Sequence, residues 1–415
     1  MMVKLFFFIF LFHLTFIRSK TKHYKMKIIT VQAPVNIAVI KYWGKKDENL
    51  IIPLNDSISG TLSMDHLCAT TSIAFSNEFD SNRMWLNGVE VKIDDNKRLV
   101  RCIENVRKLA ESTVGWPSNH YIRICSRNNF PTAAGLASSA AGYACLCYAL
   151  CKLFEINDPY IISSLARLGS GSACRSIYGG IVRWIAGYDH QTSIARQVIT
   201  ENEWPEIRIF VCVVSDHRKD TSSTSGMQLS CQTSSLIKYR AENVVPDHCD
   251  QIQKAINERN FDKFAEITMK DSNQFHAICQ DTYPPIRYMN DTSWSIVNLI
   301  HFINHSFGHN VACYTFDAGP NACIYCLDNH APILIKSIRR MYQKNDGTEL
   351  EIKGITYQTD QIVIDQKIND YIDSRKQNAE DLKYIISTRL GSGPKILTNQ
   401  FDSNCLLLDN GLPKN

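Results

Sequence analysis

The sequence lacks both of the glycine-rich motifs that most often bind phosphate. It has no Gly-x-x-x-x-Gly-Lys-Ser/Thr segment and no Gly-x-Gly-x-x-Gly segment after a strand. It also lacks a strong charge imbalance, because the formal net charge is only +4 over 415 residues. This argues against a nucleic acid or an acidic membrane surface as the main partner. Positive charge that binds an anion must therefore be clustered locally.

A disulfide framework is not indicated either. The fifteen cysteines are odd in number, scattered, and mostly placed in apolar runs, which is typical of buried reduced thiols. Cys323-Ile324-Tyr325-Cys326 has redox or zinc spacing, but it has no second pair and lies in a strand-like run, so core packing is predicted. His301, His305 and His309 lack a carboxylate at matching spacing, and we interpret them as a solvated helix face.

The N-terminus is apolar over residues 5–17, a length too short for an untilted membrane span. No clear small-residue cleavage site follows, so a signal anchor, a cleaved signal and an extension before Met26 all remain open. Sequons occur at Asn55, Asn290 and Asn304, a number expected by chance. We predict a cytoplasmic protein that carries an unassigned leader, in keeping with reduced thiols.

The segment 129–142 reads as a small-residue loop that leads into a helix. Gly135 permits an unusual turn, and Ser138 and Ser139 stand at the predicted helix start, before an apolar run over 140–150. Free backbone N–H groups and the positive end of a helix dipole suit phosphate, and the hydroxyls could add hydrogen bonds or a ligand to Mg²⁺. The alternative is a tightly packed loop that lets a helix approach a sheet.

Two further segments have the composition of anion sites. Lys41 and Lys45 flank Tyr42-Trp43-Gly44 at the end of a strand predicted over 27–40; the alternative is a solvated strand end. The segment 169–180 is rich in Ser and Gly and contains Arg175, which suits a diphosphate or a carboxylate; the alternative is a flexible turn. Two such loops in one chain favour shared anionic ligands.

Asp317 follows a strand predicted over 312–316 and precedes a tight turn. Proteins with α/β folds often place reactive groups there, although a lone Asp in such a turn is more often a cap. A domain boundary is predicted near Trp204-Pro205. Periodicity and turn residues predict strands at 58–76, 85–91 (a hairpin), 120–125 and 207–215, and helices at 95–113, 158–169, 227–243, 247–257, 261–278, 291–306 and 332–343.

Together these motifs resemble the diphosphomevalonate decarboxylases, a family of the GHMP kinase superfamily. The matching segments are APVNIAVIKYWGK (33–45), NNFPTAAGLASSAAG (128–142), GSGSACRS (169–176), DTSSTSGMQL (220–229), MKDSNQFHA (269–277), YPPIRYMNDTS (283–293), YTFDAGPNA (314–322) and GSGP (391–394). The ordinary kinases of the superfamily usually carry Gly-Leu-Gly-Ser-Ser where this chain has Gly135-Leu136-Ala137-Ser138-Ser139. They also carry a late glycine-rich motif where this chain places Asp317.

The resemblance implies a two-domain α/β (α+β) GHMP kinase fold with its active site in the cleft between the domains. The expected divisions are a leader at 1–26, an N-terminal domain at 27–204, a C-terminal domain at 205–400 and a tail at 401–415. It also implies a homodimer and a site that combines ATP, Mg²⁺ and mevalonate 5-diphosphate in isoprenoid and sterol biosynthesis.

The implied activity is ATP-dependent decarboxylation of the diphosphate to isopentenyl diphosphate. The resemblance assigns catalysis to Asp317, Lys41, Arg175 and Ser139. It assigns ATP binding to Asn128, Gly135, Ala137, Ser138 and Ser139. It assigns substrate binding to Tyr42, Trp43, Gly44, Lys45, Arg98, Ser170, Gly171, Ser172, Ala173, Cys174, Arg175 and Thr224.

The alternatives are a small-molecule kinase or a phosphomevalonate decarboxylase of the same fold. A non-catalytic homologue should lack Asp317, Lys41 or the serine pair, and this sequence retains all of them.

Overall fold

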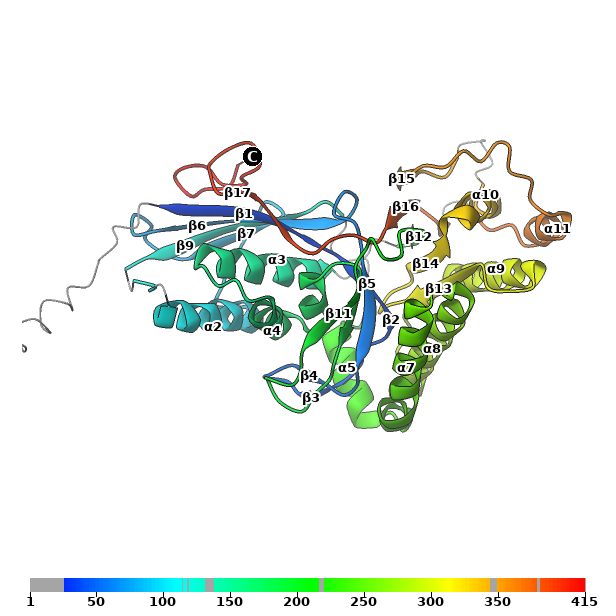
Figure 1. The fold of residues 1–415 in the computed structure, drawn as a ribbon, viewed down its shortest axis with the longest axis horizontal. Helices are drawn as coiled ribbons and strands as arrows, with labels where there is room; N and C mark the ends of the chain where they lie inside the picture. The colour runs from blue at the N-terminus through cyan, green and yellow to red at the C-terminus, as the bar shows by residue number, and fades with distance from the viewer. Residues whose placement is uncertain are drawn as a thin grey trace, which may run out of the picture.

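The computed structural model is a mixed α/β protein built in two halves, which confirms the predicted fold class (Figure 1). The structure describes residues 26–113, 115–117, 119–130, 138–215, 220–343, 349–378 and 381–414. The predicted leader therefore lies outside the described residues, except for Met26. Among the described helices, none combines the length and the apolar character needed to cross a membrane.

The first half is organised on a six-stranded sheet of order β17-β1-β6-β9-β7-β8. Its strands are β1 (Lys27–Pro34), β6 (Cys68–Ser76), β7 (Arg83–Leu86), β8 (Val89–Val91), β9 (Tyr121–Asn128) and β17 (Lys395–Thr398). The helices of this half are α2 (Lys97–Thr113), α3 (Ser138–Leu153) and α4 (Pro159–Gly169). Helix α3 is apolar almost all round and packs directly on β1 and β6, while α2 and α4 pack against α3 (Figure 1).

A second sheet of the first half has the order β11-β10-β5-β2. Its strands are β2 (Asn36–Ile40), β5 (Ser57–Thr61), β10 (Ile181–Trp184) and β11 (Ala195–Ile199), and β3 (Lys45–Asp47) pairs separately with β4 (Ile52–Pro53). The single strand predicted over 27–40 is thus wrong, because the chain leaves one sheet at Pro34 and enters the other at Asn36. The strand predicted over 58–76 likewise divides between β5 and β6. An apolar alternation continues through such a break, so periodicity alone does not reveal it.

The second half carries a five-stranded sheet of order β13-β14-β12-β16-β15. Its strands are β12 (Ile207–Val213), β13 (Ala312–Phe316), β14 (Ala322–Leu327), β15 (Ile352–Gly354) and β16 (Tyr384–Arg389). Its helices are α5 (Ser223–Thr233), α6 (Leu236–Tyr239), α7 (Val245–Asn257), α8 (Phe261–Asp281), α9 (Asp291–Phe307), α10 (Ala331–Met341) and α11 (Gln366–Ser374). Among the short helical segments, η1 (Gly171–Ile177, 3-10) follows α4 in the first half, whereas η2 (Arg240–Val244, π) and η3 (Asp328–His330, 3-10) belong to the second half.

The helix predicted over 227–243 is interrupted rather than continuous. Helix α5 ends at Thr233, and Ser234 caps it with an extended backbone. The Ser234 hydroxyl donates to the Asp281 carboxylate at 2.7 Å, so the break is fixed by a contact with the end of α8. Serine favours such local hydrogen bonds over helix continuation.

The two halves meet along β2. The Thr315 hydroxyl donates to the carbonyl of Ala38 at 3.2 Å, and the Tyr325 hydroxyl donates to the carbonyl of Ile37 at 3.2 Å. Strand β17 returns from the second half to pair with β1. The domain limits expected at 204 and 400 stay a prediction.

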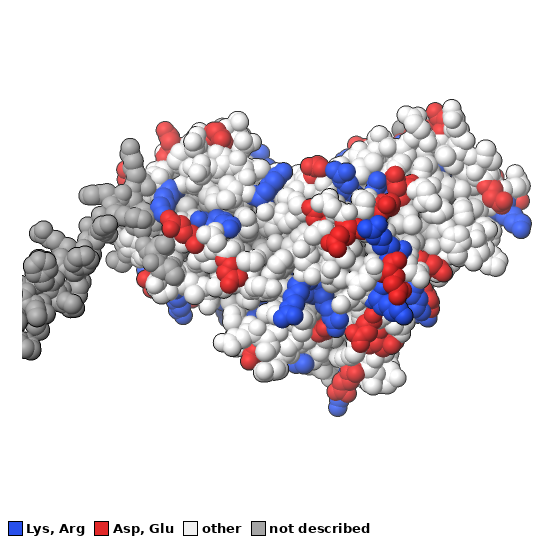
Figure 2. All heavy atoms as spheres, in the orientation of Figure 1, with Lys and Arg blue, Asp and Glu red and all other residues white. Residues whose placement is uncertain are grey.

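All fifteen cysteines fall in the described residues as free thiols, and every one except Cys231 is buried. Cys323 and Cys326 lie in β14 and belong to the core, which confirms the predicted packing role. The sequon residues Asn55 and Asn304 are only 4% and 6% exposed and bond to the protein's own backbone, so neither is accessible for modification in this fold. Figure 2 shows basic and acidic side chains interspersed on the face it displays, in keeping with the small net charge.

Candidate active site

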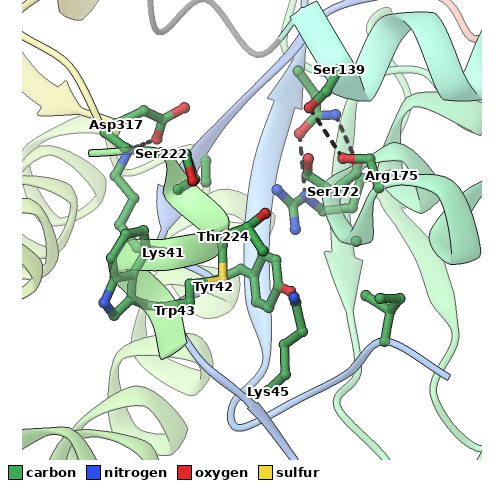
Figure 3. Close-up of a pocket in the computed structure, with 18 of the residues that line it drawn as sticks. Lys41, Tyr42, Trp43, Lys45, Ser139, Ser172, Arg175, Ser222, Thr224 and Asp317 are labelled. Atoms are coloured by element: carbon green, nitrogen blue, oxygen red, sulfur yellow. Dashed lines mark hydrogen bonds and ion pairs between the residues drawn. The ribbon is translucent and has the colours of Figure 1, made fainter. Parts of the chain in front are cut away.

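A pocket of about 350 Å³ lies where the two halves meet (Figure 3). It is bounded by the end of β2, the N-termini of α3 and α5, η1, and the end of β13. The predicted site residues that line it are Lys41, Tyr42, Trp43, Lys45, Arg98, Ser138, Ser139, Ser170, Gly171, Ser172, Arg175, Thr224 and Asp317. The fold thus gathers most of the residues that the sequence singled out.

An ion pair between Lys41 and Asp317 forms one side of the pocket. Each residue directly follows a buried strand, β2 for Lys41 and β13 for Asp317, and Lys41 Nζ lies 2.5 Å from Asp317 Oδ1. The lysine side chain is 3% exposed, whereas the aspartate side chain is 29% exposed. No other side chain among the described residues binds this carboxylate. The lysine side chain is therefore buried, whereas the Asp317 carboxylate is accessible from the pocket.

Arg175 forms the opposite side (Figure 3). Its Nε donates to Ser59 Oγ at 2.9 Å and to Asn36 Oδ1 at 3.3 Å, and its Nη1 donates to Ser57 Oγ at 2.6 Å. Within the described chain no carboxylate lies within ion-pair distance of this guanidinium, and only 2% of the residue is exposed. Burial lowers the pKa of Arg175 from its ordinary value. A buried cation held only by neutral groups is a strong site for an anionic ligand.

Serine hydroxyls at the start of α3 also line the pocket, and Figure 3 shows Ser139 on the side of Arg175. Ser138 and Ser139 begin α3, whose first turn contains no acidic residue, and Ser139 Oγ lies 3.2 Å from Ser170 Oγ. The positive end of the helix dipole and the N–H groups of the first helical turn attract phosphate. The preceding loop residues Gly135 and Ala137 lie outside the described residues, so their predicted part in ATP binding stays a prediction.

A second helix start, which the sequence reasoning largely missed, points to the same pocket. Ser222 caps α5 by accepting a hydrogen bond from the Ser225 backbone N–H at 3.1 Å, and Ser222, Ser223 and Thr224 all line the pocket. Only Thr224 had been predicted. The signal was available in the serine pair spaced by three residues, which is typical of a helix N-cap.

Aromatic side chains shape the floor of the site. The Tyr42 ring meets Trp184 edge-on at 4.8 Å, and the Trp43 ring meets Phe275 edge-on at the same distance. The Trp43 indole N–H donates to Ser230 Oγ at 2.9 Å, which fixes the ring. Burial raises the pKa of the Tyr42 phenol, so this side chain stays neutral and acts as a wall.

Of the predicted residues that the structure describes, four do not line the pocket. Gly44 has a φ of +88°, and an added Cβ would lie 2.4 Å from Leu54, so the glycine is needed for the turn itself. Ala173 and Cys174 point into the hydrophobic core from η1, and Asn128 ends β9. Their assigned binding roles stay predictions.

Asn36 begins β2 and also lines the pocket, although its sequence position predicted only a strand residue. Its Nδ2 donates to the Ser172 carbonyl at 3.0 Å and to Ser176 Oγ at 2.7 Å. A polar residue inside a fully buried strand was the signal that could have identified it.

The pocket is electropositive: its lining includes four cationic side chains, Lys41, Lys45, Arg98 and Arg175, against the one carboxylate of Asp317. Lys45 is itself paired with Glu48 at 2.5 Å. The described residues contain no cluster of three or more His, Cys, Asp or Glu side chains that could hold a metal ion. The lining nevertheless suits a Mg²⁺ ion that is bound to the phosphates of ATP. Such an ion commonly keeps several of its water ligands and needs few oxygen ligands from the protein. The serine hydroxyls at the start of α3 supply such oxygens.

Comparison with known proteins decides the family. Residues 33–195 match the model of the diphosphomevalonate decarboxylase-like N-terminal domain, and residues 209–397 match that of the mevalonate 5-diphosphate decarboxylase C-terminal domain. The chain belongs to the diphosphomevalonate decarboxylase family. A family member from Danio rerio, diphosphomevalonate decarboxylase, is 48% identical over 397 residues, which cover 94% of this chain and 97% of the relative.

Solved structures of the diphosphomevalonate decarboxylase family share the fold. A crystal structure of mevalonate 5-diphosphate decarboxylase aligns with a TM-score of 0.79 at 42% identity, covering 92% of this chain and 99% of that one. A structure of MDDEF in complex with MVAPP, AMPPCP and magnesium aligns with a TM-score of 0.70 at 28% identity, covering 90% of this chain and 99% of that one.

Proposed function

We propose that this protein catalyses the ATP-dependent decarboxylation of mevalonate 5-diphosphate to isopentenyl diphosphate, with release of ADP, phosphate and CO₂. The observation that carries the proposal is the accessible carboxylate of Asp317, paired with Lys41, across the pocket from the buried Arg175 guanidinium. Membership of the family supports the choice of substrate.

The anionic ends of the two substrates would be held by the cationic and hydroxyl-rich lining. Arg175, together with residues 170–172, suits the carboxylate or the diphosphate of mevalonate 5-diphosphate. Lys45, Arg98 and Thr224 extend the same surface. Holding both substrates in the correct relative orientation supplies a large part of the catalysis, because the reacting groups no longer have to meet by diffusion.

Asp317 would accept a hydrogen bond from the tertiary hydroxyl of the substrate and remove its proton as the γ-phosphoryl group arrives. The hydroxyl oxygen forms a bond to phosphorus, and ADP leaves. The C–O bond then breaks with release of phosphate, and the bonding pair of the carboxylate's C–C bond becomes the new C=C bond as CO₂ departs. Lys41 holds the Asp317 carboxylate in place through their ion pair, and its positive charge offsets the negative charge that builds up on the phosphoryl group during transfer.

ATP would place its phosphates at the start of α3, where Ser138 and Ser139 meet the positive end of the helix dipole. AMPPCP, an ATP analogue, and magnesium in a similar structure support this use of ATP and Mg²⁺. Magnesium, when bound, neutralises phosphate charge; the serine hydroxyls are the protein groups suited to hold it.

A cytoplasmic location and a homodimeric state complete the proposal. Fourteen buried free thiols favour a reducing compartment. The dimer rests on the family resemblance, and sedimentation of the purified protein tests it: a single species at the monomer mass would exclude it.

The experiment that tests the activity is a turnover assay with ATP, Mg²⁺ and mevalonate 5-diphosphate that follows ADP and CO₂ together. Equal release of both products is expected. ADP without CO₂ would instead indicate a kinase that stops at the phosphorylated intermediate. Turnover with mevalonate 5-phosphate in place of the diphosphate would indicate the phosphomevalonate decarboxylase alternative.

A further inference from the structure

Asp271 is a buried carboxylate outside the pocket that binds the backbone of a pocket residue. It lies on α8 with no exposed surface, and its Oδ1 accepts hydrogen bonds from the Lys41 backbone N–H at 2.8 Å and from Arg240 Nη2 at 2.9 Å. Its Oδ2 lies 3.0 Å from His248 Nδ1. All of these partners are distant in the sequence, so the carboxylate ties β2 of the first half to the helices of the second half.

The carbonyl of Lys41 is held by the same group of side chains. It accepts hydrogen bonds from Arg240 Nη2 at 3.2 Å and from Asn55 Nδ2 at 3.0 Å. Both backbone polar groups of Lys41 are therefore bound by buried side chains rather than by a neighbouring strand. This fixes the point from which the lysine side chain reaches toward Asp317.

The next residue of α8 holds the other member of the ion pair. Ser272 Oγ accepts a hydrogen bond from the backbone N–H of Phe316 at 3.1 Å, and Phe316 directly precedes Asp317. Figure 1 shows α8 lying beside β13, which ends at Phe316. Two adjacent residues on one helix thus bind the two strand ends that carry Lys41 and Asp317.

We propose that Asp271 and Ser272 are positioning residues that set the separation of Lys41 from Asp317 for the proton transfer. The inference rests on the proposed function. A purely structural role is the weaker explanation, because replacing a buried ion pair with apolar groups is often neutral for stability. Here the carboxylate also satisfies the backbone of a residue in the site, and a shift of about 1 Å in such a group lowers turnover by up to about 10²-fold.

The test compares steady-state kinetics of Asp271→Asn and Ser272→Ala with those of the parent protein. We expect kcat for CO₂ release to fall about tenfold or more, with the KM values for ATP and the diphosphate substrate unchanged, because neither residue lines the pocket. The matched control is Thr268→Val, one turn earlier on α8. Its hydroxyl is fully buried and donates to the Phe264 carbonyl, away from the ion pair.

A rescue variant separates positioning from folding. In Asp271→Asn combined with Arg240→Met, both buried charges are removed, while the amide oxygen can still accept from the Lys41 N–H. Because Arg240→Met also removes the hydrogen bond to the Lys41 carbonyl, the double variant should regain stability relative to Asp271→Asn but keep a low kcat. Recovery of kcat to the parent value would overturn the positioning role of Asp271. If the Asp271 variants do not fold, Ser272→Ala tests the inference by itself, because it leaves the buried Asp271–Arg240 ion pair intact.

An unchanged kcat in Ser272→Ala and Asp271→Asn would overturn the inference, as would an equal loss in Thr268→Val. Both results are distinct from failure of the proposed function, in which the parent protein itself releases no CO₂.

Discussion

The guanidinium of Arg98 donates a hydrogen bond to the hydroxyl of Thr224 at 3.0 Å, and this contact joins the start of α2 to the start of α5. The two residues are 126 positions apart and belong to different halves of the molecule. Because both line the pocket, the contact joins the two halves at the pocket wall and places a positive charge there. The positive charge that Arg98 brings to the pocket leads to the first prediction.

Arg98→Ala should raise the KM for mevalonate 5-diphosphate by about tenfold, the effect of losing about 1.4 kcal/mol of binding from a charged hydrogen bond. The matched control is Arg101→Ala, one turn later on α2. The Arg101 guanidinium donates to the backbone carbonyl of Asn49 at 2.6 Å and does not line the pocket. Equal KM values for the two variants would remove Arg98 from the substrate surface.

Asp317→Asn should lower kcat by at least about 10²-fold while the dissociation constant for ATP stays within a factor of two or so, because a general base is lost but no phosphate contact is. Two measurements on the same variant check this prediction. The rate of CO₂ release gives kcat, and equilibrium titration with a fluorescent ATP analogue gives the dissociation constant for the nucleotide. Asp328→Asn is the control: this aspartate also follows a strand of the same sheet, and it pairs with Arg208 at 2.7 Å. Normal turnover of Asp317→Asn would exclude the proposed base.

Arg175→Lys should raise the KM for the diphosphate substrate by about tenfold and also lower kcat, because lysine cannot reproduce a planar guanidinium that is held by Ser57 and Ser59. Arg167→Lys is the matched control, since Arg167 is equally buried. Its partners are the carbonyls of Leu50 and Ser193 and the ring of His190, outside the pocket. It should cost about 1–3 kcal/mol of stability without changing the KM. Similar kinetics for both variants would contradict a binding role for Arg175.

His276 should make the protein less stable in acid. Burial, and secondly the charge of Lys41, lower the pKa of its imidazole to about 3. An unfolded histidine has a pKa near 6.5, so between about pH 6.5 and 3 the unfolded chain binds a proton that the folded protein does not. The stabilisation is therefore complete above pH 6.5 and falls by roughly 1.4 kcal/mol per pH unit as the solution is acidified.

Urea denaturation of His276→Asn and the parent protein between pH 7 and 5 measures this effect. The free energy of unfolding of the variant should decline less steeply by about 1 kcal/mol per pH unit. His305→Asn, at an exposed position of α9, is the control. Parallel slopes for His276→Asn and the parent would show that folded His276 takes up the proton.

Much of the local structure was predictable because it depends on short-range chemistry. Asp158 followed by Pro159 predicted the start of α4, and the structure shows Asp158 accepting from the Tyr160 N–H. Asn87-Gly88 predicted the hairpin of β7 and β8, which forms there with Gly88 at positive φ. The break at Val35 was not predictable in the same way. The apolar pattern of a buried strand is the same whichever sheet the strand joins, so the pattern does not show where the chain changes sheets.

The residues of the candidate site were likewise partly predictable from the sequence and partly decided by the tertiary structure. The sequence by itself determined which residues carry the chemistry: serines before an apolar helix, lysines after a strand, and an aspartate at a strand end, since these depend on residue type and near neighbours. Only the tertiary structure decided that Lys41 would meet Asp317 across 276 positions, that Ser222 and Asn36 would join them, and that Asp271 would hold the lysine backbone. Such contacts depend on how two sheets and α8 pack together, and no local pattern encodes a distance between strands that are remote in the chain.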